Sequence, residues 1–520
     1  MAPSNPHETL PAASGTRNTC TTGTAATCQG PPGIFNSVNL KKNMDAETGL
    51  NTTIGLQDKD ASAKEQATVS PQDCGNSLSE RQWTRAQAIE TYITKVCHAL
   101  MIYGAPTHRL ERYAHHTAQA LGLQLQSFYM PGCMMISFSH PKLQQGGVQI
   151  IRCVQQLNLS KLYDVRCVYK NVIHEKTTVE DASILIDEIA NRPEQFPTWI
   201  RVFSYGLASA FVGPVSYNAQ PIDLPIIFVL GTLIGFSELV LVPRSELYGY
   251  VFEIFAAILA SFLGRVFGSL QWGQGQGFCF SAISQASIVM ILPGFTITSS
   301  ALELQSRNMV SGAVRMVYGI VYTLFLSLGF LIGISIYGAI DETASSATTC
   351  STTYGVWWPI IFVIPFTFCY IIVQNGKWNT MPPMLGFSLA GWAVNHFSSE
   401  NFGDAQPLSQ ALGALTVGVL ANLYARIEHG LAATLMHPAI YVQVPGSLAA
   451  SGSLISGLAI ADQITRNGTN KLTPHEALVA QLDAGYTMVS IGVAITVGLS
   501  VSVLLVYPLR QKGRSGIFSY

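Results

Sequence analysis

The chain has 520 residues, of which 48% are hydrophobic and only 11% are charged, and its formal net charge is −1. Soluble globular proteins carry about 25% charged residues, so this composition excludes a protein that is soluble throughout. The balanced charge and the lack of a long basic run also argue against nucleic-acid binding. Because 34 of the 59 charged residues lie in the first 200 positions, we predict a polar N-terminal part followed by a membrane part.

Residues 1–83 are predicted to form a disordered polar tail. They are rich in Ser, Thr, Asn, Gly and Pro and show no periodic apolar pattern, so burial cannot offset the entropy that ordering removes. The first 80 residues also contain no apolar core of the length that a secretory signal needs. We therefore expect the first membrane helix to direct targeting.

Residues 84–200 are predicted to form a small cytosolic α+β domain. Apolar residues at spacings of three and four indicate helices, and short β-like runs indicate strands. Thr107 can cap the second helix, and Gly122 can end it. The expected elements, which are two helices, three strands and a final helix, cover residues 84–103, 107–121, 123–130, 134–139, 148–154 and 179–190.

Long apolar runs fill the chain beyond residue 200 and predict ten membrane-spanning helices. Most of these runs approach the roughly 20 residues that cross a bilayer. Small residues recur at helix-contact spacing, as at Gly329 and Gly333, which suits close packing between membrane helices. The expected spans lie near residues 201–217, 224–243, 249–268, 278–297, 313–338, 355–374, 381–397, 408–425, 432–460 and 484–508.

An internal repeat links two of these spans. The segments 292–300 and 444–452 both place Pro-Gly inside an apolar run and follow it with small hydroxyl residues, at an offset of 152 residues. We therefore predict two repeats of five helices each. Because five is odd, the second repeat is inverted relative to the first, as in many secondary transporters. The predicted first repeat, second repeat and final cytosolic tail cover residues 201–350, 351–510 and 511–520.

The Pro-Gly pairs predict two broken helices. Proline removes an intrahelical hydrogen bond and glycine permits a bend, so backbone groups become available at membrane depth to a small zwitterion. The alternative is a packing kink that touches no substrate, with the nearby hydroxyls bonded to carbonyls one turn away. The residues predicted to line a substrate pathway are Pro293, Gly294, Thr298, Ser299, Ser300, Pro445, Gly446, Ser447 and Ser451.

Four charged residues in or near the spans are candidates for proton coupling or gating. A charge inside the membrane costs roughly 2.5 to 3.5 kcal/mol on insertion scales, which singles out Glu238 and Glu253 for coupling. Both could instead be solvated near the inner interface. Glu303 and Arg315 are expected to pair across a short loop, either as a structural contact or as a gate.

The distribution of Lys and Arg predicts that both termini lie in the cytosol. With this orientation, nine of these residues flank inner loops, and only Arg265, Arg466 and Lys471 fall in outer loops. The plasma membrane and the vacuolar membrane are equally compatible with this topology. The ten cysteines lack the close spacings of zinc or redox sites, so we expect mostly reduced or buried thiols.

These features resemble the threonine/serine exporter family, and within it the larger fungal-type branch of pheromone-regulated membrane proteins. The resemblance covers about residues 84–508 and implies a cytosolic N-terminal domain, ten spans, and export of threonine and serine coupled to the proton-motive force. Relatives that divide the two parts between chains are associated with dicarboxylate export. The segments that carry the resemblance are 104–111, 136–138, 197–199, 205–209, 292–294, 311–315 and 444–447.

The motif of the N-terminal domain consists of Gly104, Thr107, Arg109 and Glu111, which are expected to cap and brace the second helix or to form a regulatory contact beneath the pore. The same helix carries three histidines whose spacing is not that of a metal site, so a solvated polar face is the simpler interpretation: His108, His115 and His116. The sequence has neither a Gly-x-Ser-x-Gly elbow nor a His-Glu-x-x-His motif. We therefore predict no enzyme, cofactor or metal.

The predicted function is a secondary transporter that exports small hydroxylated amino acids by alternating access, coupled to protons. Its expected partners are the amino acid, protons and the lipid bilayer, without nucleic acid, and a homo-oligomer is compatible with the sequence. Two alternatives stay open. One is a membrane scaffold or sensor in cell fusion or mating that transports nothing, and the other is a dicarboxylate exporter.

Overall fold

The computed structural model describes the chain from residue 71 to residue 507 with several gaps. The described ranges are 71–139, 146–272, 276–341, 357–402, 405–428, 432–443 and 474–507, with single positions between 344 and 355 and between 452 and 458. Residues 1–70 and the predicted tail at 511–520 lie outside these ranges. Helix α1 (Pro71–Ile102) begins before residue 84, which corrects the predicted end of the disordered tail. Proline is favoured at the first helical position, so Pro71 can start a helix without an apolar stripe.

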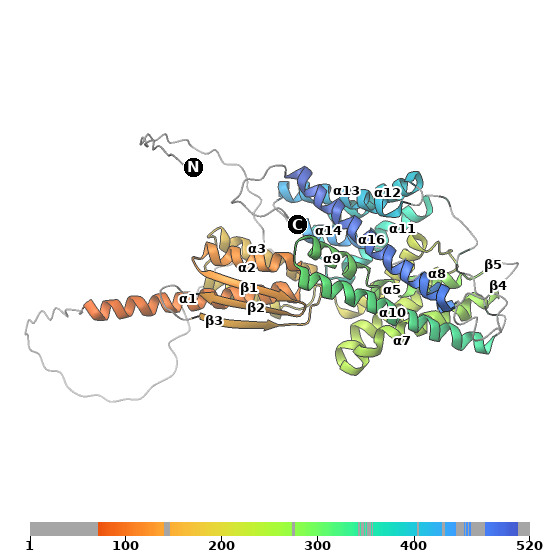
Figure 1. The fold of residues 1–520 in the computed structure, drawn as a ribbon, viewed down its shortest axis with the longest axis horizontal. Coiled ribbons are helices and arrows are strands. Elements are labelled where there is room, and N and C mark those ends of the chain that lie inside the picture. Colours follow the sequence, from red (N-terminus) through yellow and green to blue (C-terminus); the bar gives the residue numbers. More distant parts are fainter. Residues whose placement is uncertain are drawn as a thin grey trace, which may run out of the picture. The chain divides into compact units, whose positions relative to one another are not determined.

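The N-terminal domain contains helices and a three-stranded antiparallel sheet with the strand order β1-β2-β3. Figure 1 shows the three strands together beside α1 and α2. The predicted helices and strands are confirmed, and the sequence prediction omits only α3. The elements after α1 are α2 (Thr107–Ala120), β1 (Gln124–Met130), β2 (Cys133–Ser139), β3 (Gly146–Arg152), α3 (Leu159–Ile173) and α4 (Val179–Asn191).

The sequence of α3 contains two features that indicate a helix, an apolar periodicity and a capping residue. Buried apolar residues recur along it at spacings of three and four, including Leu162, Val165 and Val168, but charged residues between them weaken the pattern. The side chain of Asn158 caps the helix by accepting a hydrogen bond from the Lys161 amide at 3.0 Å. An asparagine in this position satisfies one of the amides that a helix start leaves free.

The sheet buries one face against α1. Alternate residues of a strand point to the same side, and Met134, Ile136 and Phe138 of β2 are all buried in one cluster with Tyr92 and Ile93 of α1. The hairpin between β1 and β2 turns at Pro131-Gly132, where Gly132 has a φ of +78°. Glycine adopts this conformation without a steric penalty.

Helices occupy each of the ten predicted membrane segments, but fewer are long and apolar enough to cross a membrane. Five helices are long and apolar enough to cross a membrane, or six if the bent pair α8 and α9 counts as one span. Among the described residues the predicted count of ten spans is therefore not borne out by length and hydropathy alone. The helices are α5 (Thr198–Ser216), α6 (Leu224–Phe236), α7 (Glu246–Ser269), α8 (Phe280–Ser287), α9 (Gly294–Gln305), α10 (Met309–Ile340), α11 (Trp357–Val373), α12 (Met381–Phe402), α13 (Gln406–Glu428), α14 (Ala432–Gln443) and α16 (Pro474–Val506).

The helices that are not counted as spans are either too short or not apolar enough. The five helices that pass are α6 extended to Arg244, α7, α10, α13 and the C-terminal part of α16. Helix α11 is apolar but has only 17 residues, and α14 has only 12. Helices α5 and α12 are longer but are not apolar enough over their length.

The same neighbours recur in the two halves of the membrane part. In the first half α5 packs against α6, α7 against α10, and α8 against both α6 and α7. In the second half α11 packs against α12, α13 against α16, and α14 against both α12 and α13. The two sets correspond helix by helix if α11 is the counterpart of α5. Helices α5 and α11 also pack directly against each other.

The predicted helix contacts at small residues are present. A Cβ atom added to Gly333 of α10 would lie 2.5 Å from the carbonyl oxygen of Ile258 in α7. One added to Gly329 would lie 2.6 Å from the Cβ of Ala257. Such distances leave no room for a side chain, so glycine allows α7 and α10 to approach closely.

The sequence expectation for Arg265 is wrong, and one pair of cysteines departs from the expected thiols. Cys279, at the start of α8, and Cys350, in the segment after α10, form a disulfide with a Cα–Cα distance of 5.5 Å, because the fold joins positions that are 71 residues apart. Arg265 does not lie in a loop. It is fully buried within α7, and its Nη1 donates to the carbonyl oxygen of Ile334 at 2.8 Å.

The substitution Gly333→Leu is expected to lower the melting temperature of the purified protein, because overpacking a tight contact costs roughly 1 to 3 kcal/mol. The matched control is Gly386→Leu in α12, where an added Cβ meets no atom within 4 Å. Thermal unfolding in detergent measures both. Equal melting temperatures for the two variants would contradict the close packing of α7 and α10.

Candidate functional site

The predicted break in the first Pro-Gly helix is present. Helix α8 ends at Ser287, a 3-10 turn covers Val289–Ile291, and α9 begins at Gly294. The two helical parts are bent by 48° relative to each other. Pro293 precedes the first residue of α9 and provides no amide hydrogen, so the regular helix cannot continue through this point.

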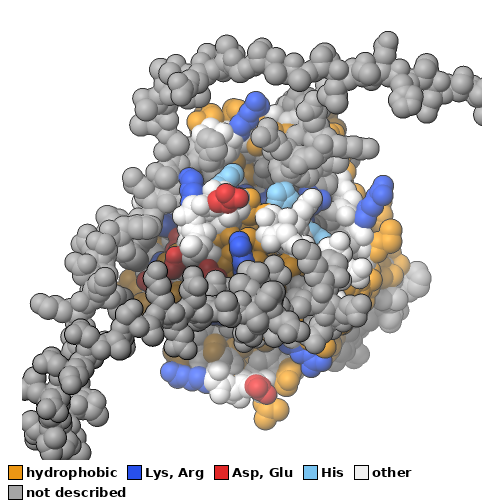
Figure 2. Space-filling model, turned by 90° about the vertical axis from the view of Figure 1, so that its left-hand side faces the viewer, with side chains coloured by type: hydrophobic (Ala, Val, Ile, Leu, Met, Phe, Trp, Pro, Cys, Tyr) orange, Lys and Arg blue, Asp and Glu red, His pale blue; other side chains and the backbone are white. Residues whose placement is uncertain are grey.

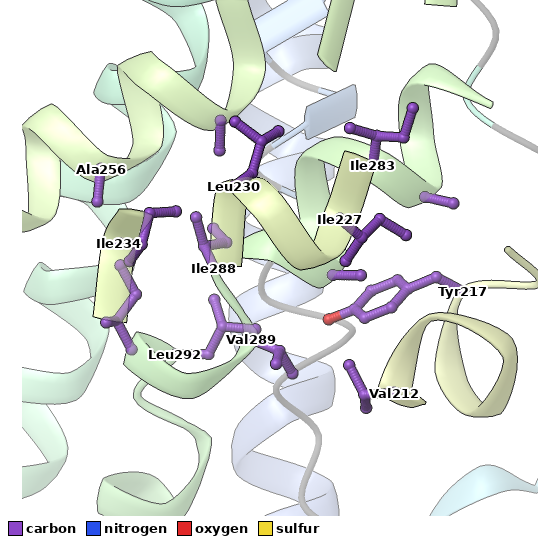
Figure 3. Packing of buried hydrophobic residues seen from close by; sticks show 14 of the residues in the cluster. Val212, Tyr217, Ile227, Leu230, Ile234, Ala256, Ile283, Ile288, Val289 and Leu292 are labelled. Carbon is purple, nitrogen blue, oxygen red and sulfur yellow. The ribbon is translucent and has the colours of Figure 1, made fainter. Parts of the chain in front are cut away.

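Apolar side chains surround the break. Ile288, Val289 and Leu292 belong to the largest buried cluster, together with Leu230 and Ile234 of α6. Figure 3 shows these side chains beside one another, with the turn between α8 and α9 packed toward α6. An apolar environment supplies no water, so the backbone groups at the break need partners from the protein.

Tyr441 of α14 provides such a partner. Its hydroxyl lies 3.1 Å from the carbonyl oxygen of Val289 and 3.2 Å from that of Met290. Tyr441 and Val289 are 152 residues apart, which is the offset between the two Pro-Gly pairs. Tyr441 and Val289 therefore occupy corresponding positions of the two halves, and the hydrogen bond joins these positions.

A cavity of about 110 Å³ lies beside α9. It is lined by the loop after α1, the segment after β3 with the start of α3, helix α9, Arg315 of α10, helix α14 and Leu499 of α16. Its polar or charged lining side chains are Gln155, Thr298, Ser299, Glu303, Arg315, Thr434 and His437. The cavity thus joins the N-terminal domain to the broken helix.

The structure divides the predicted pathway residues into two groups. Thr298 and Ser299 line the cavity, and their hydroxyls donate to the carbonyls of Gly294 and Thr296 in their own helix at 3.1 and 3.0 Å. Their oxygens can still accept hydrogen bonds from a ligand. Ser300 is fully buried and donates to the carbonyl of Ile297 at 2.7 Å, so it does not line the cavity.

The predicted residues of the second Pro-Gly segment cannot be placed. Pro445, Gly446, Ser447 and Ser451 lie outside the described residues. Their role as pathway residues stays a prediction.

Glu303 and Arg315 form the predicted ion pair, with 3.2 Å between Oε1 and Nη1. Glu303 is almost fully buried and also accepts a hydrogen bond from the Ser311 hydroxyl at 2.6 Å. The other Arg315 nitrogen, Nη2, donates to the Tyr129 hydroxyl and to Gln155 Oε1, both at 3.0 Å. Arg315 therefore connects the end of the broken helix to the N-terminal domain, a contact that the sequence did not predict.

Glu111 of the N-terminal motif supports this connection. Its Oε1 accepts a hydrogen bond from the Tyr129 amide at 2.9 Å, so it holds the residue whose hydroxyl binds Arg315. Burial raises the pKa of the Tyr129 hydroxyl, although Arg315 opposes this effect. Tyr129 is consequently a neutral hydrogen-bond partner of Arg315 at physiological pH.

The other motif residues shape the same region. Gly104 lines the cavity with a φ of +85°, and a Cβ added there would lie 2.7 Å from Leu157 Cδ1. Only glycine combines this conformation with such a close approach. Thr107 is fully buried, and Arg109 donates to the Tyr113 hydroxyl at 3.0 Å. Burial lowers the pKa of the Arg109 guanidinium.

Glu238 and Glu253 lie away from the cavity. Glu238 is part of a π-helical turn (Ser237–Leu241) after α6, and its carboxylate accepts a hydrogen bond from the Tyr205 hydroxyl at 2.6 Å. Such turns occur often at functional sites. Glu253 is partly buried on α7. Proton coupling through either residue stays a prediction.

Three aromatic residues near the break, of which His437 lines the cavity, were not singled out from the sequence. His437 Nε2 lies 2.9 Å from the Tyr370 hydroxyl of α11, and the Tyr370 ring stacks on Tyr441 with centroids 4.1 Å apart. The signal was available, because His437 is a titratable residue inside a predicted span.

A second set of contacts links the N-terminal domain to the other half of the membrane part. The amides of Leu159 and Ser160, at the start of α3, donate to the carbonyls of Gln374 and Asn375 at 3.1 and 3.0 Å. Lys377 pairs with Asp164 of α3 at 2.9 Å. The domain therefore contacts both α10 and the segment after α11.

The histidines of the N-terminal domain form no metal site in the part of the chain that the structure describes. His115 and His116 are exposed on α2, and no group of three or more His, Cys, Asp or Glu residues could hold a metal ion there. Figure 2 views the end that carries α1 and shows charged side chains and histidines dispersed among other polar groups.

Residues 91–337 match the sequence profile of the threonine/serine exporter family. This part of the chain is similar to the threonine/serine exporter family. The match covers the N-terminal domain and the first half of the membrane part, including the broken helix and the Glu303–Arg315 pair. The resemblance noted in the sequence is confirmed, and the family is one of membrane transporters for small molecules.

Similar proteins from fungi extend the likeness to the second half. The chain is 39% identical to pheromone-regulated membrane protein 10 of Candida glabrata, over 92% of this chain and 61% of that protein. It is 41% identical to the protein of that name in Candida albicans, over 83% and 39%. An uncharacterized protein of Schizosaccharomyces pombe is 42% identical over 83% and 57%. The aligned region thus spans about 39% to 61% of these relatives. No solved structure matches the chain.

The substitution Glu303→Gln is expected to destabilise the protein by about 3 to 5 kcal/mol, because it leaves the Arg315 guanidinium without its buried carboxylate partner. The double variant Glu303→Gln/Arg315→Gln should lose less stability than the two single variants together. Chemical or thermal unfolding measures this coupling, with the exposed Glu246→Gln as control. Additive effects would show that the pair contributes no interaction energy.

Proposed function

We propose that the protein is a secondary transporter that exports small hydroxylated amino acids, such as threonine and serine, by alternating access. The observation that carries this proposal is the helix broken at Pro293 beside a small cavity whose largely apolar wall carries a few polar side chains. Broken helices in transporters provide backbone and side-chain groups at the site where substrate binds. The proposal assigns no catalytic step, cofactor or metal to the chain.

The chemistry of the cavity supports a small zwitterionic substrate. Its volume of about 110 Å³ is far below the roughly 300 to 1,000 Å³ of pockets for drug-sized ligands. The Thr298 and Ser299 oxygens can accept hydrogen bonds from an ammonium or hydroxyl group. The name of the family supports threonine and serine.

The packing supports two related halves. The neighbours of α5 to α10 recur among α11 to α16, and Tyr441 contacts the position that corresponds to it in the first half. A contact between corresponding positions is expected on a pseudo-two-fold axis. We therefore propose inverted repeats of five helices that rock against each other around the cavity.

The disulfide supports the proposed orientation. Arg315, near the start of α10, binds the N-terminal domain, whereas Cys350 follows the end of this helix. The 32 residues of α10 span about 48 Å, which exceeds the thickness of a bilayer core. Disulfides persist in oxidising compartments. We therefore place the N-terminal domain in the cytosol and the disulfide outside or in a lumen, in the plasma membrane or the vacuolar membrane.

Efflux of labelled threonine or serine from proteoliposomes tests the proposal. We expect transport that a proton gradient stimulates, and a large loss of flux in Pro293→Ala, because a straight helix withdraws the groups at the break. Pro365→Ala in α11 is the control for removing a helical proline. Absence of threonine and serine movement under every gradient would overturn the substrate assignment.

The two alternatives give different results in the same vesicles. A dicarboxylate exporter would move succinate and leave threonine in place. A scaffold in mating, which the names of the relatives favour, would move neither compound and would tolerate Pro293→Ala in a mating assay.

A further inference from the structure

We infer that His437, paired with Tyr370, is the proton-binding residue of this cavity, and that its proton competes with the substrate. The inference rests on the proposed transport function and assigns the coupling group within it. Neither Glu238 nor Glu253 lines the cavity, whereas His437 does.

His437 of α14 is buried between α9 and α11. It lies on α14 with 7% of its surface exposed, and its ring packs edge-on against Phe295 in the first turn of α9, with centroids 4.3 Å apart. Its Nε2 lies 2.9 Å from the Tyr370 hydroxyl of α11. The imidazole therefore contacts the broken helix and is bonded to the first helix of the second half.

Protonation reverses this hydrogen bond when the neutral imidazole carries its hydrogen on Nδ1. A neutral imidazole can accept at Nε2 from the Tyr370 O–H group, but an imidazolium has a hydrogen on both nitrogens and can only donate. When a proton binds at the Nε2 lone pair, Tyr370 becomes the acceptor and its own hydrogen needs a new direction.

The reversal occurs next to the break. The Tyr370 ring stacks on Tyr441, and the Tyr441 hydroxyl is bonded to the carbonyls of Val289 and Met290 in the turn between α8 and α9. Phe295 contacts the imidazole from the other side of Pro293. His437 thus contacts α9 after Pro293 directly, and it is linked through Tyr370 and Tyr441 to the turn before Pro293.

The charges around His437 favour competition with an amino acid. The titratable and charged groups near it are Tyr370, Tyr441 on its own helix, and Glu303 and Arg315 across the cavity. Helices α12 and α13 pack against α14 through an apolar cluster that includes Met384 and Val417. Since Glu303 is already paired with Arg315, an imidazolium and a substrate ammonium would repel each other in the same small cavity.

Competition is what proton-driven export requires. A proton that enters from the far side displaces the substrate, and the substrate that enters from the cytosol displaces the proton. By linkage, a proton that weakens substrate binding is itself bound more weakly when substrate is present.

The test compares two transport modes in proteoliposomes that contain the full chain. Exchange of labelled for unlabelled threonine without a gradient reports binding and rocking, and gradient-driven efflux reports coupling. In His437→Gln the amide can still bond to Tyr370 but cannot titrate. We expect threonine exchange by this variant to be independent of pH and its efflux to gain no stimulation from the proton gradient. His396→Gln in α12 is the control and should behave as the wild type.

The outcomes separate the two proposals. Gradient stimulation in His437→Gln equal to that of the wild type would overturn this inference and leave the transport function standing. A wild type that exchanges threonine without any pH dependence would also overturn it. A wild type that moves neither threonine nor serine would remove the proposed function instead.

A second variant covers the case in which His437→Gln fails to fold. Tyr370→Phe keeps the imidazole but removes the hydroxyl that accepts from its protonated form. The pH midpoint of exchange should then move by about one unit toward lower pH, which is the effect expected from one hydrogen bond to a charged group. An unchanged midpoint would contradict the role of the His437–Tyr370 pair.

Discussion

The structure depends on one constraint: a helix that breaks inside an apolar core must find partners for its backbone groups. At Pro293 these partners come from the other half of the chain, since the Tyr441 hydroxyl bonds the carbonyls of Val289 and Met290. The break is therefore also a junction between halves. A change in the environment of Tyr441 therefore affects the partners of the break.

The N-terminal domain imposes a second constraint on movement. It holds α10 through Arg315 and holds the segment after α11 through Gln374, Asn375 and Lys377. If the halves rock against each other, at least one of these contacts must break or shift. The motif residue Glu111 accepts from the Tyr129 amide and so helps to position the hydroxyl that binds Arg315. A domain in this position can regulate a transporter without an enzymatic activity of its own.

The sequence predicted those features that depend on local chemistry. Pro293 and Gly294 indicated the break, and the spacing of charges indicated the Glu303–Arg315 pair, because both follow from neighbours in the chain. It did not predict what depends on distant segments. Arg265 reads as a loop residue until α10 covers it, and Cys279 and Cys350 read as separate thiols until the fold joins them. His437 was overlooked because its partner Tyr370 lies 67 residues away.

The most direct measurement of the central claim is the rate at which an introduced thiol at position 299 reacts with a soluble reagent. If substrate occupies the cavity beside the broken helix, threonine or serine should slow the labelling of Ser299→Cys and leave the labelling of an exposed thiol, Leu482→Cys, unchanged. A rate at position 299 that saturating threonine and serine do not alter would contradict a substrate site at the break.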